Sequence, residues 1–508
     1  MQFLKSSYWT AQQYEGIYRP FTIFSLSVDY AIWKRWPAGF RLTNLALHAV
    51  NGFLLFLLCT SLSGAGIVPF AAMLIYLAHP VHSEAVTTIV GRSELFSACF
   101  LLSAWLLFRR GHTFWPALLF ALALLSKENA IVLPGILLLD LILTRKGTAA
   151  VDAPEGRTRP ITGLAVMTAV AVGYLALRFS VLGALGIPAS AQYMGGQLTY
   201  VERMMTSGRV FLEYLRLLFF PLHLAGDYDF NAIPIATLSN WDAWLGLLLI
   251  AGIVLAAVLY SRRDRVISFG ILFAFLVFVP ASNWIMPISV LMAERFLYLP
   301  LIGLSLSAAV VFCSIHDRRL QRLAGIGLLV TAIVLCNSHD YIRRNDFTFF
   351  GNMVRVEPNS AKARLGYGYA LLQAGFRDDA ARQFEAGLQI IPDYPELLTT
   401  LAMTKMTKSD CSQAWPLMKR ALEIDPAHAD THRRMGDCYF KEGKIQEAES
   451  MYRHAAETIP YPDSMLYFMW GRSLEDTGQK ESAINAYERA ALIDPDNVFI
   501  KQKLSSLK

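Results

Sequence analysis

Charged residues are scarce in this sequence, and long apolar runs are abundant. Asp, Glu, Lys and Arg make up 17% of its 508 residues, whereas soluble domains contain about 25%. Hydrophobic residues reach 54%, and the mean hydropathy is +0.38. This composition excludes a disordered chain, a coiled coil, a disulfide-rich secreted module and a simple cytosolic enzyme.

The motifs of several common chemistries are absent. The sequence contains no G-x-x-x-x-G-K-[ST], G-x-G-x-x-G or G-x-S-x-G pattern, which leaves nucleotide hydrolysis and serine-hydrolase chemistry without support. Its 6 cysteines include no C-x-x-C pair, so a zinc or redox site is not expected. Cys411 and Cys438 lie in the polar C-terminal part, where a disulfide between them is an open alternative.

Charge divides the chain into two parts. Residues 1–344 contain 26 Lys and Arg against 17 Asp and Glu, whereas residues 345–508 contain 20 against 23. The basic excess of the first part lies between hydrophobic segments, where membrane topology explains it better than nucleic-acid binding does. We therefore predict a polytopic membrane domain over 1–344, a soluble domain over 345–508, and no nucleic-acid partner.

Ten apolar segments of the first part are expected to cross a membrane, because a spanning helix needs about 20 largely apolar residues. They are 42–60, 67–80, 87–108, two arms within 114–143, 161–180, 241–260, 266–280, 296–315 and 323–342. Lys and Arg in short loops stay cytoplasmic, which places four basic loops inside and the C-terminal part outside. These loops contain Arg109, Arg145, Arg263 and Arg319.

Two segments need a separate interpretation. Segment 202–222 is apolar but contains several charged residues, so it is predicted to lie along the outer interface as an amphipathic helix. Residues 1–41 should also lie outside, although no hydrophobic segment precedes them in this sequence. A first span upstream of residue 1 is therefore expected.

The C-terminal part repeats itself every 34 residues. The period is marked by Pro358, Pro392, Pro426 and Pro460, and Pro495 follows after 35 residues. Small residues recur in the same frame at 368, 402, 436 and 471, and large ones at 384, 418, 452 and 487. This pattern is typical of the tetratricopeptide repeat, a helix–turn–helix unit that stacks into a protein-binding solenoid. Four repeats are predicted, at about 359–392, 393–426, 427–460 and 461–495, in an all-α protein.

Ionisable residues gather at the predicted outer membrane face. His79, His82 and Glu84 lie within six residues, a set that can bind a divalent metal or supply a general base, or can simply form a solvated turn. Arg92 and Glu94 follow just inside the next span. Charges there are costly unless they are paired, so these two either serve a site or pair with each other.

Three further groups lie on the same predicted face. Lys127 and Glu128 form the turn of the short hairpin, where a Lys suits a phosphate, although a solvated turn is the alternative. Arg178 lies near the outer end of its span, where an Arg usually snorkels. The segment 293–300 opens a span from outside, either as part of a site or as an interfacial anchor. It contains Glu294, Arg295 and Tyr298.

Several motifs occur in a fixed order along the chain, namely Tyr18-Arg19-Pro20-Phe21, Asn44 with His48 and Asn51, and the segments 79–86, 90–95, 124–128 and 293–300. Together with the repeats, this ordered set resembles the transmembrane and tetratricopeptide-repeat-containing O-mannosyltransferases. The resemblance implies a C-type glycosyltransferase fold and transfer of a sugar from a polyprenyl-phosphate donor on the extracytoplasmic side. It also implies a catalytic carboxylate shortly before the Tyr-Arg-Pro motif. The motif that carries this carboxylate is not found here, because the only acidic residues before residue 84 are Glu15 and Asp29.

We therefore expect a membrane glycosyltransferase that moves a sugar, mannose by the resemblance, to a protein Ser/Thr or another acceptor, with the repeats binding the acceptor or partners. Glu84, with His82, is assigned the role of general base or of support for a divalent metal ion. A divalent metal is therefore the one cofactor that we consider. Donor phosphate is assigned to Arg92, Lys127, Arg178 and Arg295. Further candidates are His79, Glu94, Glu128, Glu294 and Tyr298.

The alternative function is a non-catalytic membrane scaffold whose repeats assemble envelope proteins. Short loops and the lack of any Asn-x-Ser/Thr sequon favour a bacterial inner membrane with periplasmic repeats. For a eukaryotic source the corresponding expectation is the ER membrane.

Overall fold

The computed structural model is helical, with no strand among the residues it describes, which confirms the all-α fold class. These residues are 17–34, 36–144, 160–183, 198–222, 224–225, 228, 233–285, 288, 290–407, 410–459 and 463–507. Some predicted features fall outside them, namely Glu15, the basic loop that contains Arg145, and Pro460. The chain divides into two units, one that ends at Thr348 and one that begins at Phe349.

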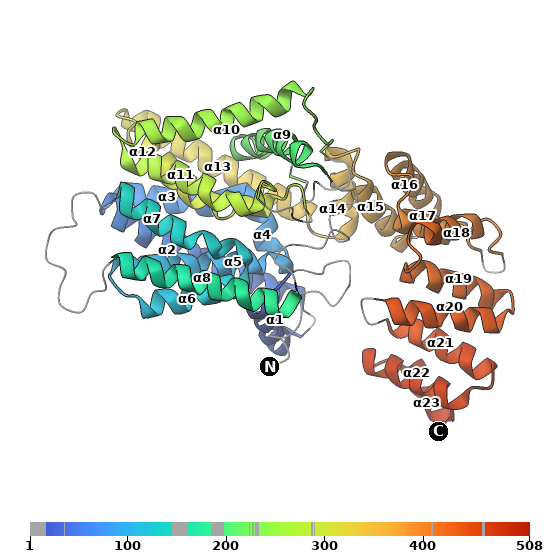
Figure 1. Ribbon diagram of the computed structural model, residues 1–508. Helices are drawn as coiled ribbons and strands as arrows, with labels where there is room; N and C mark the ends of the chain where they lie inside the picture. Colours follow the sequence, from blue (N-terminus) through green and yellow to red (C-terminus); the bar gives the residue numbers. More distant parts are fainter. Residues whose placement is uncertain are drawn as a thin grey trace. The chain divides into compact units, whose positions relative to one another are not determined.

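The first unit is a bundle whose long helices run side by side (Figure 1). In chain order they are α1 (Pro20–Trp33), α2 (Pro37–Ser63), α3 (Ile67–Ala78), α5 (Arg92–Arg109), α6 (Phe114–Ser126), α7 (Leu133–Leu143), α8 (Pro160–Leu182), α9 (Tyr200–Phe219), α10 (Trp241–Tyr260), α11 (Arg265–Phe278), α12 (Pro300–Cys313) and α13 (Arg318–Ile342). Short helical turns connect some of them, namely η3 (Pro80–His82), α4 (Ser83–Thr87), η4 (Ile89–Gly91), η5 (Glu128–Val132), η7 (Val279–Ala281) and η8 (Glu294–Leu297).

Five helices of the described residues are long and apolar enough to cross a membrane. They are Pro37–Ser63, Ile89–Arg109, Pro160–Leu182, Trp241–Tyr260 and Arg318–Ile342, and the shorter apolar helices are Ile67–Ala78, Phe114–Ser126, Arg265–Ala281 and Pro300–Cys313. The segment expected to span at 296–315 is shorter than predicted. Because η8 occupies its first residues, the α-helix begins only at Pro300, a residue that suits the first helical position.

The hairpin within 114–143 consists of two short arms, α6 with 13 residues and α7 with 11. Its turn is covered by protein. Lys127 is only 3% exposed, and the Thr22 hydroxyl donates to the Ser126 carbonyl at 2.9 Å. Arms too short to cross a bilayer alone need such cover, because the backbone polar groups of a turn cannot face lipid.

The segment 202–222 forms most of α9, which packs tightly against α10. A Cβ added to Gly246 would lie 1.9 Å from the Gly208 carbonyl oxygen, so glycine is required where the two backbones meet. Beside this contact, Arg209 Nε donates to Asp242 Oδ2 at 2.7 Å. The buried face of α9 includes Tyr214, whose role in the candidate site is described below.

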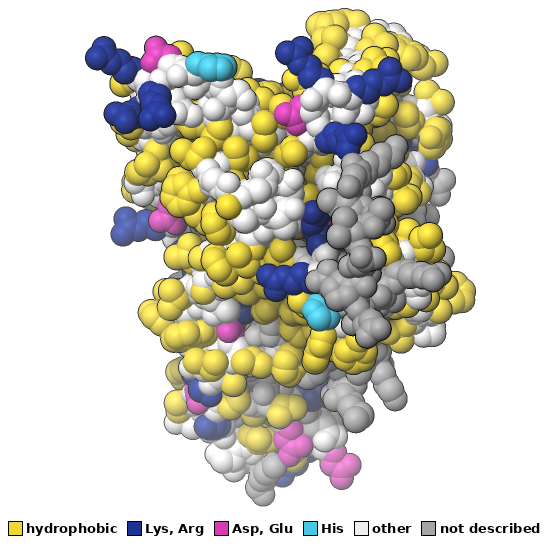
Figure 2. All heavy atoms as spheres, turned by 90° about the vertical axis from the view of Figure 1, so that its left-hand side faces the viewer, with side chains coloured by type: hydrophobic (Ala, Val, Ile, Leu, Met, Phe, Trp, Pro, Cys, Tyr) yellow, Lys and Arg dark blue, Asp and Glu magenta, His cyan; other side chains and the backbone are white. Residues whose placement is uncertain are grey.

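The helices α5, α10 and α12 end on the same side of the bundle, at the left of Figure 1. Figure 2 looks onto that side, where Lys and Arg side chains stand at the rim and near the middle of the face, among hydrophobic side chains. Within this end, the buried Asp140 of α7 forms an ion pair with Arg109 of α5 and accepts from Trp105 Nε1 at 3.0 Å. The same-sided arrangement of these helix ends is the one that the predicted topology requires.

The second unit consists of paired helices that stack in sequence (Figure 1). After α14 (Asp346–Val356), which leads into it, they are α15 (Ala361–Gln373), α16 (Arg377–Ile390), α17 (Pro395–Lys405), α18 (Trp415–Ile424), α19 (Ala429–Lys441), α20 (Ile445–Thr458), α21 (Ser464–Asp476), α22 (Lys480–Ile493) and α23 (Val498–Leu507). A Cβ on Gly368 or Gly436 would come within 2.2 Å of the Phe384 ring or 2.7 Å of the Tyr452 ring. The small residue of each pair therefore leaves room for the large side chain that packs on it, as the sequence pattern predicted.

The second repeat has a different turn from the others. Gly375, Gly443 and Gly478 end the first helix of their repeats with φ of +86°, +75° and +80°, a conformation that glycine adopts without strain. Between α17 and α18 the turn is longer, and a disulfide joins Cys411 to Cys438 of α19. The disulfide that the sequence left open is thus present, and it links the second repeat to the third.

We expect residues 355–508 to fold alone, because repeat arrays are stabilised by contacts between neighbouring repeats. The fragment should unfold cooperatively as a helical protein in urea followed by circular dichroism. Reduction, or Cys411→Ser, should lower its free energy of unfolding by about 2–4 kcal/mol, the usual contribution of a disulfide. Reductant should have no further effect on the Cys411→Ser fragment, and equal stability with and without reductant would contradict the link.

The predicted topology places the basic loops of the first unit and the repeats of the second on opposite sides of a membrane. Single cysteines introduced at His112, between α5 and α6, and at Asn359, before α15, occupy positions that are exposed in the structure. In a background without free cysteines, a membrane-impermeant maleimide should label Asn359→Cys in intact, correctly oriented vesicles and His112→Cys only after permeabilisation. Labelling of both from one side would refute the topology.

Candidate functional site

Helix starts and short turns bring most of the candidate residues together at one end of the first unit. Glu84 lies in α4, Arg92 and Glu94 begin α5, Lys127 follows α6, and Arg295 lies in η8. The buried candidates are His82, Glu84, Arg92, Glu94, Lys127, Arg178, Glu294 and Tyr298. Burial of these side chains argues against the alternatives in which they form solvated turns, an interfacial anchor or a snorkelling Arg.

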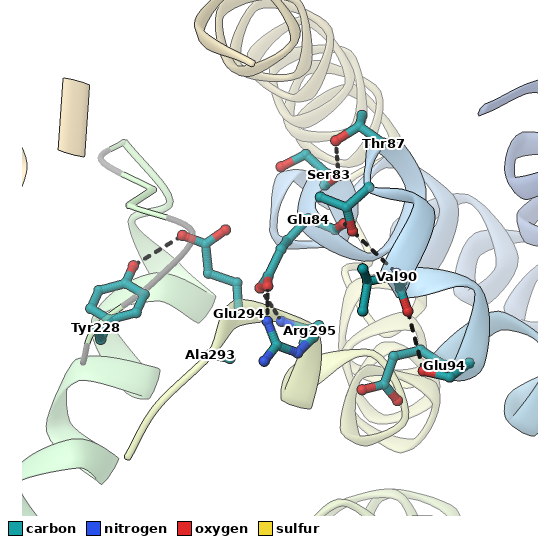
Figure 3. A network of polar contacts seen from close by, with 12 residues as sticks. Ser83, Glu84, Thr87, Val90, Glu94, Tyr228, Ala293, Glu294 and Arg295 are labelled. Carbon is teal, nitrogen blue, oxygen red and sulfur yellow. Dashed lines mark hydrogen bonds and ion pairs between the residues drawn. The ribbon is translucent and has the colours of Figure 1, made fainter. Parts of the chain in front are cut away.

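Glu84 and Arg295 are joined twice, although 211 residues separate them. The main-chain N–H of Arg295 donates to Glu84 Oε2 at 2.7 Å, and the guanidinium forms an ion pair with Glu84 Oε1. The Glu84 side chain is buried, whereas 29% of the Arg295 side chain is exposed. Figure 3 shows Arg295 turned toward Glu84, while its neighbour Glu294 is turned toward Tyr228. Arg295 is therefore both held in place and accessible.

Lys127 and Arg295 meet at one aromatic ring. Lys127 Nζ lies 5.1 Å from the centroid of the Phe296 ring, and Arg295 Cζ lies 5.4 Å from it. Both distances fall in the range of a cation–π contact. Lys127 also forms a buried ion pair with Glu94. Two of the predicted phosphate ligands thus converge from distant segments, each with its own carboxylate partner.

Arg92 belongs to a different network. Its side chain is fully buried, with Nη1 2.6 Å from Asp29 Oδ2. Nε donates to Asn44 Oδ1 at 2.7 Å, and Nη2 donates to the Phe40 carbonyl at 2.9 Å. Arg92 therefore does not pair with Glu94, which was one alternative. Its contacts connect α1, α2 and α5. They favour a structural role, holding these helices together, over the predicted contact with donor phosphate.

Glu128 has partners of its own beside this network. Arg19 binds both of its carboxylate oxygens through one edge of the guanidinium, with Nη2 2.6 Å from Oε1 and Nε 3.0 Å from Oε2. Arg178 and Lys127 also interact electrostatically with Glu128. Arg19 was not among the predicted site residues, but it lies in the Tyr-Arg-Pro motif, which was the available signal.

The histidines form an aromatic cluster with two tyrosines. The His82 ring lies 4.6 Å from the Tyr76 ring and 4.7 Å from the Tyr298 ring, between centroids. The Tyr298 hydroxyl is 2.9 Å from His48 Nδ1 and accepts from Asn51 Nδ2 at 3.0 Å. This packing turns His82 toward aromatic neighbours, whereas Glu84, two residues later, binds Arg295.

The predicted support of a metal by Glu84 and His82 does not fit these contacts. Among the described residues, no group of three or more His, Cys, Asp or Glu side chains is arranged to hold a metal ion. His79 Nε2 lies 3.1 Å from the Leu218 carbonyl oxygen, and its Nδ1 accepts from the Val81 N–H at 3.3 Å. Main-chain groups therefore occupy both nitrogens of His79.

Glu294 is buried between two partners that the sequence did not reveal. The Tyr228 hydroxyl donates to Glu294 Oε1 at 3.0 Å, and Arg343 Nη2 donates to Oε2 at 3.0 Å. Just before it, the Ala293 carbonyl accepts from the Tyr214 hydroxyl at 3.1 Å. Phe296 had a signal in the 293–300 motif, but no pattern in the sequence pointed to Tyr214, Tyr228 or Arg343.

Family comparison agrees with the repeats in the second unit. Tetratricopeptide repeat family models match residues 406–460 and 464–497. Among solved structures, MamA 41-end from Desulfovibrio magneticus RS-1 is 21% identical, covering 29% of this chain and 82% of its own, with a TM-score of 0.26.

Curated relatives match both units. Human Protein O-mannosyl-transferase TMTC3 is 25% identical, covering 96% of this chain and 58% of the relative. Protein O-mannosyl-transferase F38B6.6 of Caenorhabditis elegans is 26% identical, covering 75% of this chain and 54% of the relative. The chain thus spans somewhat more than half the length of these relatives. These matches confirm the resemblance carried by the motifs, because the chain is similar over both units to proteins named O-mannosyl-transferases.

Proposed function

We propose that the first unit transfers mannose from a polyprenyl-phosphate donor to a hydroxyl acceptor on the extracytoplasmic side of a membrane. The observation that carries the proposal is the meeting of Lys127 and Arg295 at the Phe296 ring. The names of the relatives support the reaction, and the apolar helices support a membrane setting. The donor class rests on the chemistry of this pair of cations.

A departing lipid phosphate needs cations that are already in place when its negative charge develops. Lys127 and Arg295 meet this requirement, because Glu94 and Glu84 hold them in place, Lys127 in a buried ion pair and Arg295 in a partly exposed one. The Arg295 side chain is 29% exposed, so a ligand can approach it. A planar guanidinium can bind two phosphate oxygens at once, whereas Lys127 supplies a point charge beside it.

The contacts of Glu84 suit a positioning role. Both of its oxygens are engaged by Arg295, so abstraction of an acceptor proton would first require this link to break. We propose that Glu84 orients Arg295, in place of the base function first assigned to it. This role uses the geometry as it stands.

The repeats are proposed to bind the protein acceptor or a partner outside the cytoplasm. The Cys411–Cys438 disulfide supports this placement, because disulfides persist in oxidising compartments. The relatives named above are animal proteins, so the expected bacterial inner membrane has no support from them. For a eukaryotic source we propose the ER membrane, with the repeats in the lumen.

Arg295→Gln should raise the KM for a polyprenyl-phosphate mannose donor by ~10-fold or more, because it removes one charged contact to the phosphate. The acceptor KM should be unchanged. The assay follows transfer of labelled mannose in membranes that contain the full-length protein. Arg110→Gln is the matched control, since Arg110 is exposed at the opposite end of the bundle. Equal donor KM values for both variants would contradict the proposed phosphate contact, whereas no transfer above that of membranes without the protein would favour the scaffold function.

Glu84→Gln distinguishes a positioning residue from a general base. If Glu84 acts through Arg295, its loss should raise the donor KM, and Glu84→Gln/Arg295→Gln should be no worse than Arg295→Gln alone, because contacting residues are not additive. A general base would show a different result. Its loss should lower kcat by ~10²–10⁴-fold with the donor KM unchanged, and that outcome would restore the base assignment.

A further inference from the structure

Three consecutive residues before α12 are each held by a different element. Ala293 exchanges hydrogen bonds with the Tyr214 hydroxyl of α9, which donates to its carbonyl at 3.1 Å and accepts from its N–H at 3.2 Å. Glu294 is held by Tyr228 and Arg343, and Arg295 is held by Glu84. The segment that carries Arg295 is therefore fixed residue by residue, and Figure 3 shows the side chains of 294 and 295 turned to opposite sides.

The Glu294 carboxylate depends on Arg343. The Glu294 side chain is 0% exposed, and the Arg343 side chain is 7% exposed. Arg343 Nη2 donates to one carboxylate oxygen at 3.0 Å, and the neutral Tyr228 hydroxyl donates to the other at the same distance. A buried carboxylate is tolerated when it is paired, and removal of its cation leaves an uncompensated charge.

The peptide bond between Glu294 and Arg295 connects this ion pair to the candidate site. The N–H of that peptide is the group that donates to Glu84 Oε2 at 2.7 Å. Because a peptide unit is planar, anchoring Glu294 on one side restricts the direction of the N–H and the start of the Arg295 side chain on the other. Arg343 caps the C-terminal end of α13, so the end of this helix fixes the peptide through Glu294.

We infer that Arg343, through Glu294, is a positioning residue for Arg295 and thereby for the donor phosphate. The inference rests on the proposed function, because it takes Arg295 as a phosphate ligand. Arg343 itself contacts the carboxylate of Glu294 and acts through the adjacent peptide bond. Sequence reasoning had no access to this link, since 49 residues separate the two side chains.

The test compares Arg343→Gln, Glu294→Gln and the double variant in the full-length protein. Arg343→Gln should raise the donor KM ~10-fold with the acceptor KM unchanged, because Arg295 loses its orientation. Two amides can hydrogen-bond without a buried charge, so Glu294→Gln/Arg343→Gln should recover a donor KM within about threefold of the parent. Arg344→Gln is the matched control, because Arg344 is the exposed neighbour of Arg343.

A merely structural role gives a different set of results. If Arg343 is only structural, the Arg343→Gln variant should have a lower thermal stability and give less folded protein, but its donor KM should stay within twofold of the parent. This result would overturn the inference. Failure of the double variant to recover would also overturn it, and the double variant remains informative if Arg343→Gln does not fold. If Arg295→Gln itself leaves the donor KM unchanged, the proposed function fails, which is a separate outcome.

Discussion

The ion pair between Glu84 and Arg295 is the interaction on which the candidate site depends. It connects the turn after α3 with the segment before α12, and it also uses the main-chain N–H of Arg295. Charged groups in a largely apolar bundle are stable only when they are paired. The same requirement explains why Lys127 meets Glu94, Arg92 meets Asp29 and Glu294 meets Arg343.

These pairs also define what the first unit can do. Each of them joins segments that lie far apart in the sequence, so several separate ion pairs hold the helices and turns of the first unit together. Among these residues, Lys127 and Arg295 both lie near the Phe296 ring. A site that stabilises a departing phosphate needs this kind of fixed charge, because cations that must first reorganise stabilise a transition state less well.

The sequence predicted the parts of the structure that follow from local pattern. The 34-residue period specified the paired helices, and the large residues at 384 and 452 do pack on the glycines at 368 and 436. The motifs also identified most residues of the candidate site. Their partners were not predictable, since Arg92 binds Asp29 although Glu94 is two residues away, and Glu94 binds Lys127. Such pairing depends on how the helices cross, which single-sequence periodicity does not encode.

The most direct test of the central claim is a cryo-electron-microscopy structure of the full-length protein with a polyprenyl phosphate bound. The account predicts that the phosphate lies within about 4 Å of both Lys127 Nζ and the Arg295 guanidinium, the distance of an ion pair. Glu84 should remain bound to Arg295 in that complex. A phosphate bound elsewhere, with Lys127 and Arg295 contacting only their carboxylate partners, would contradict the account.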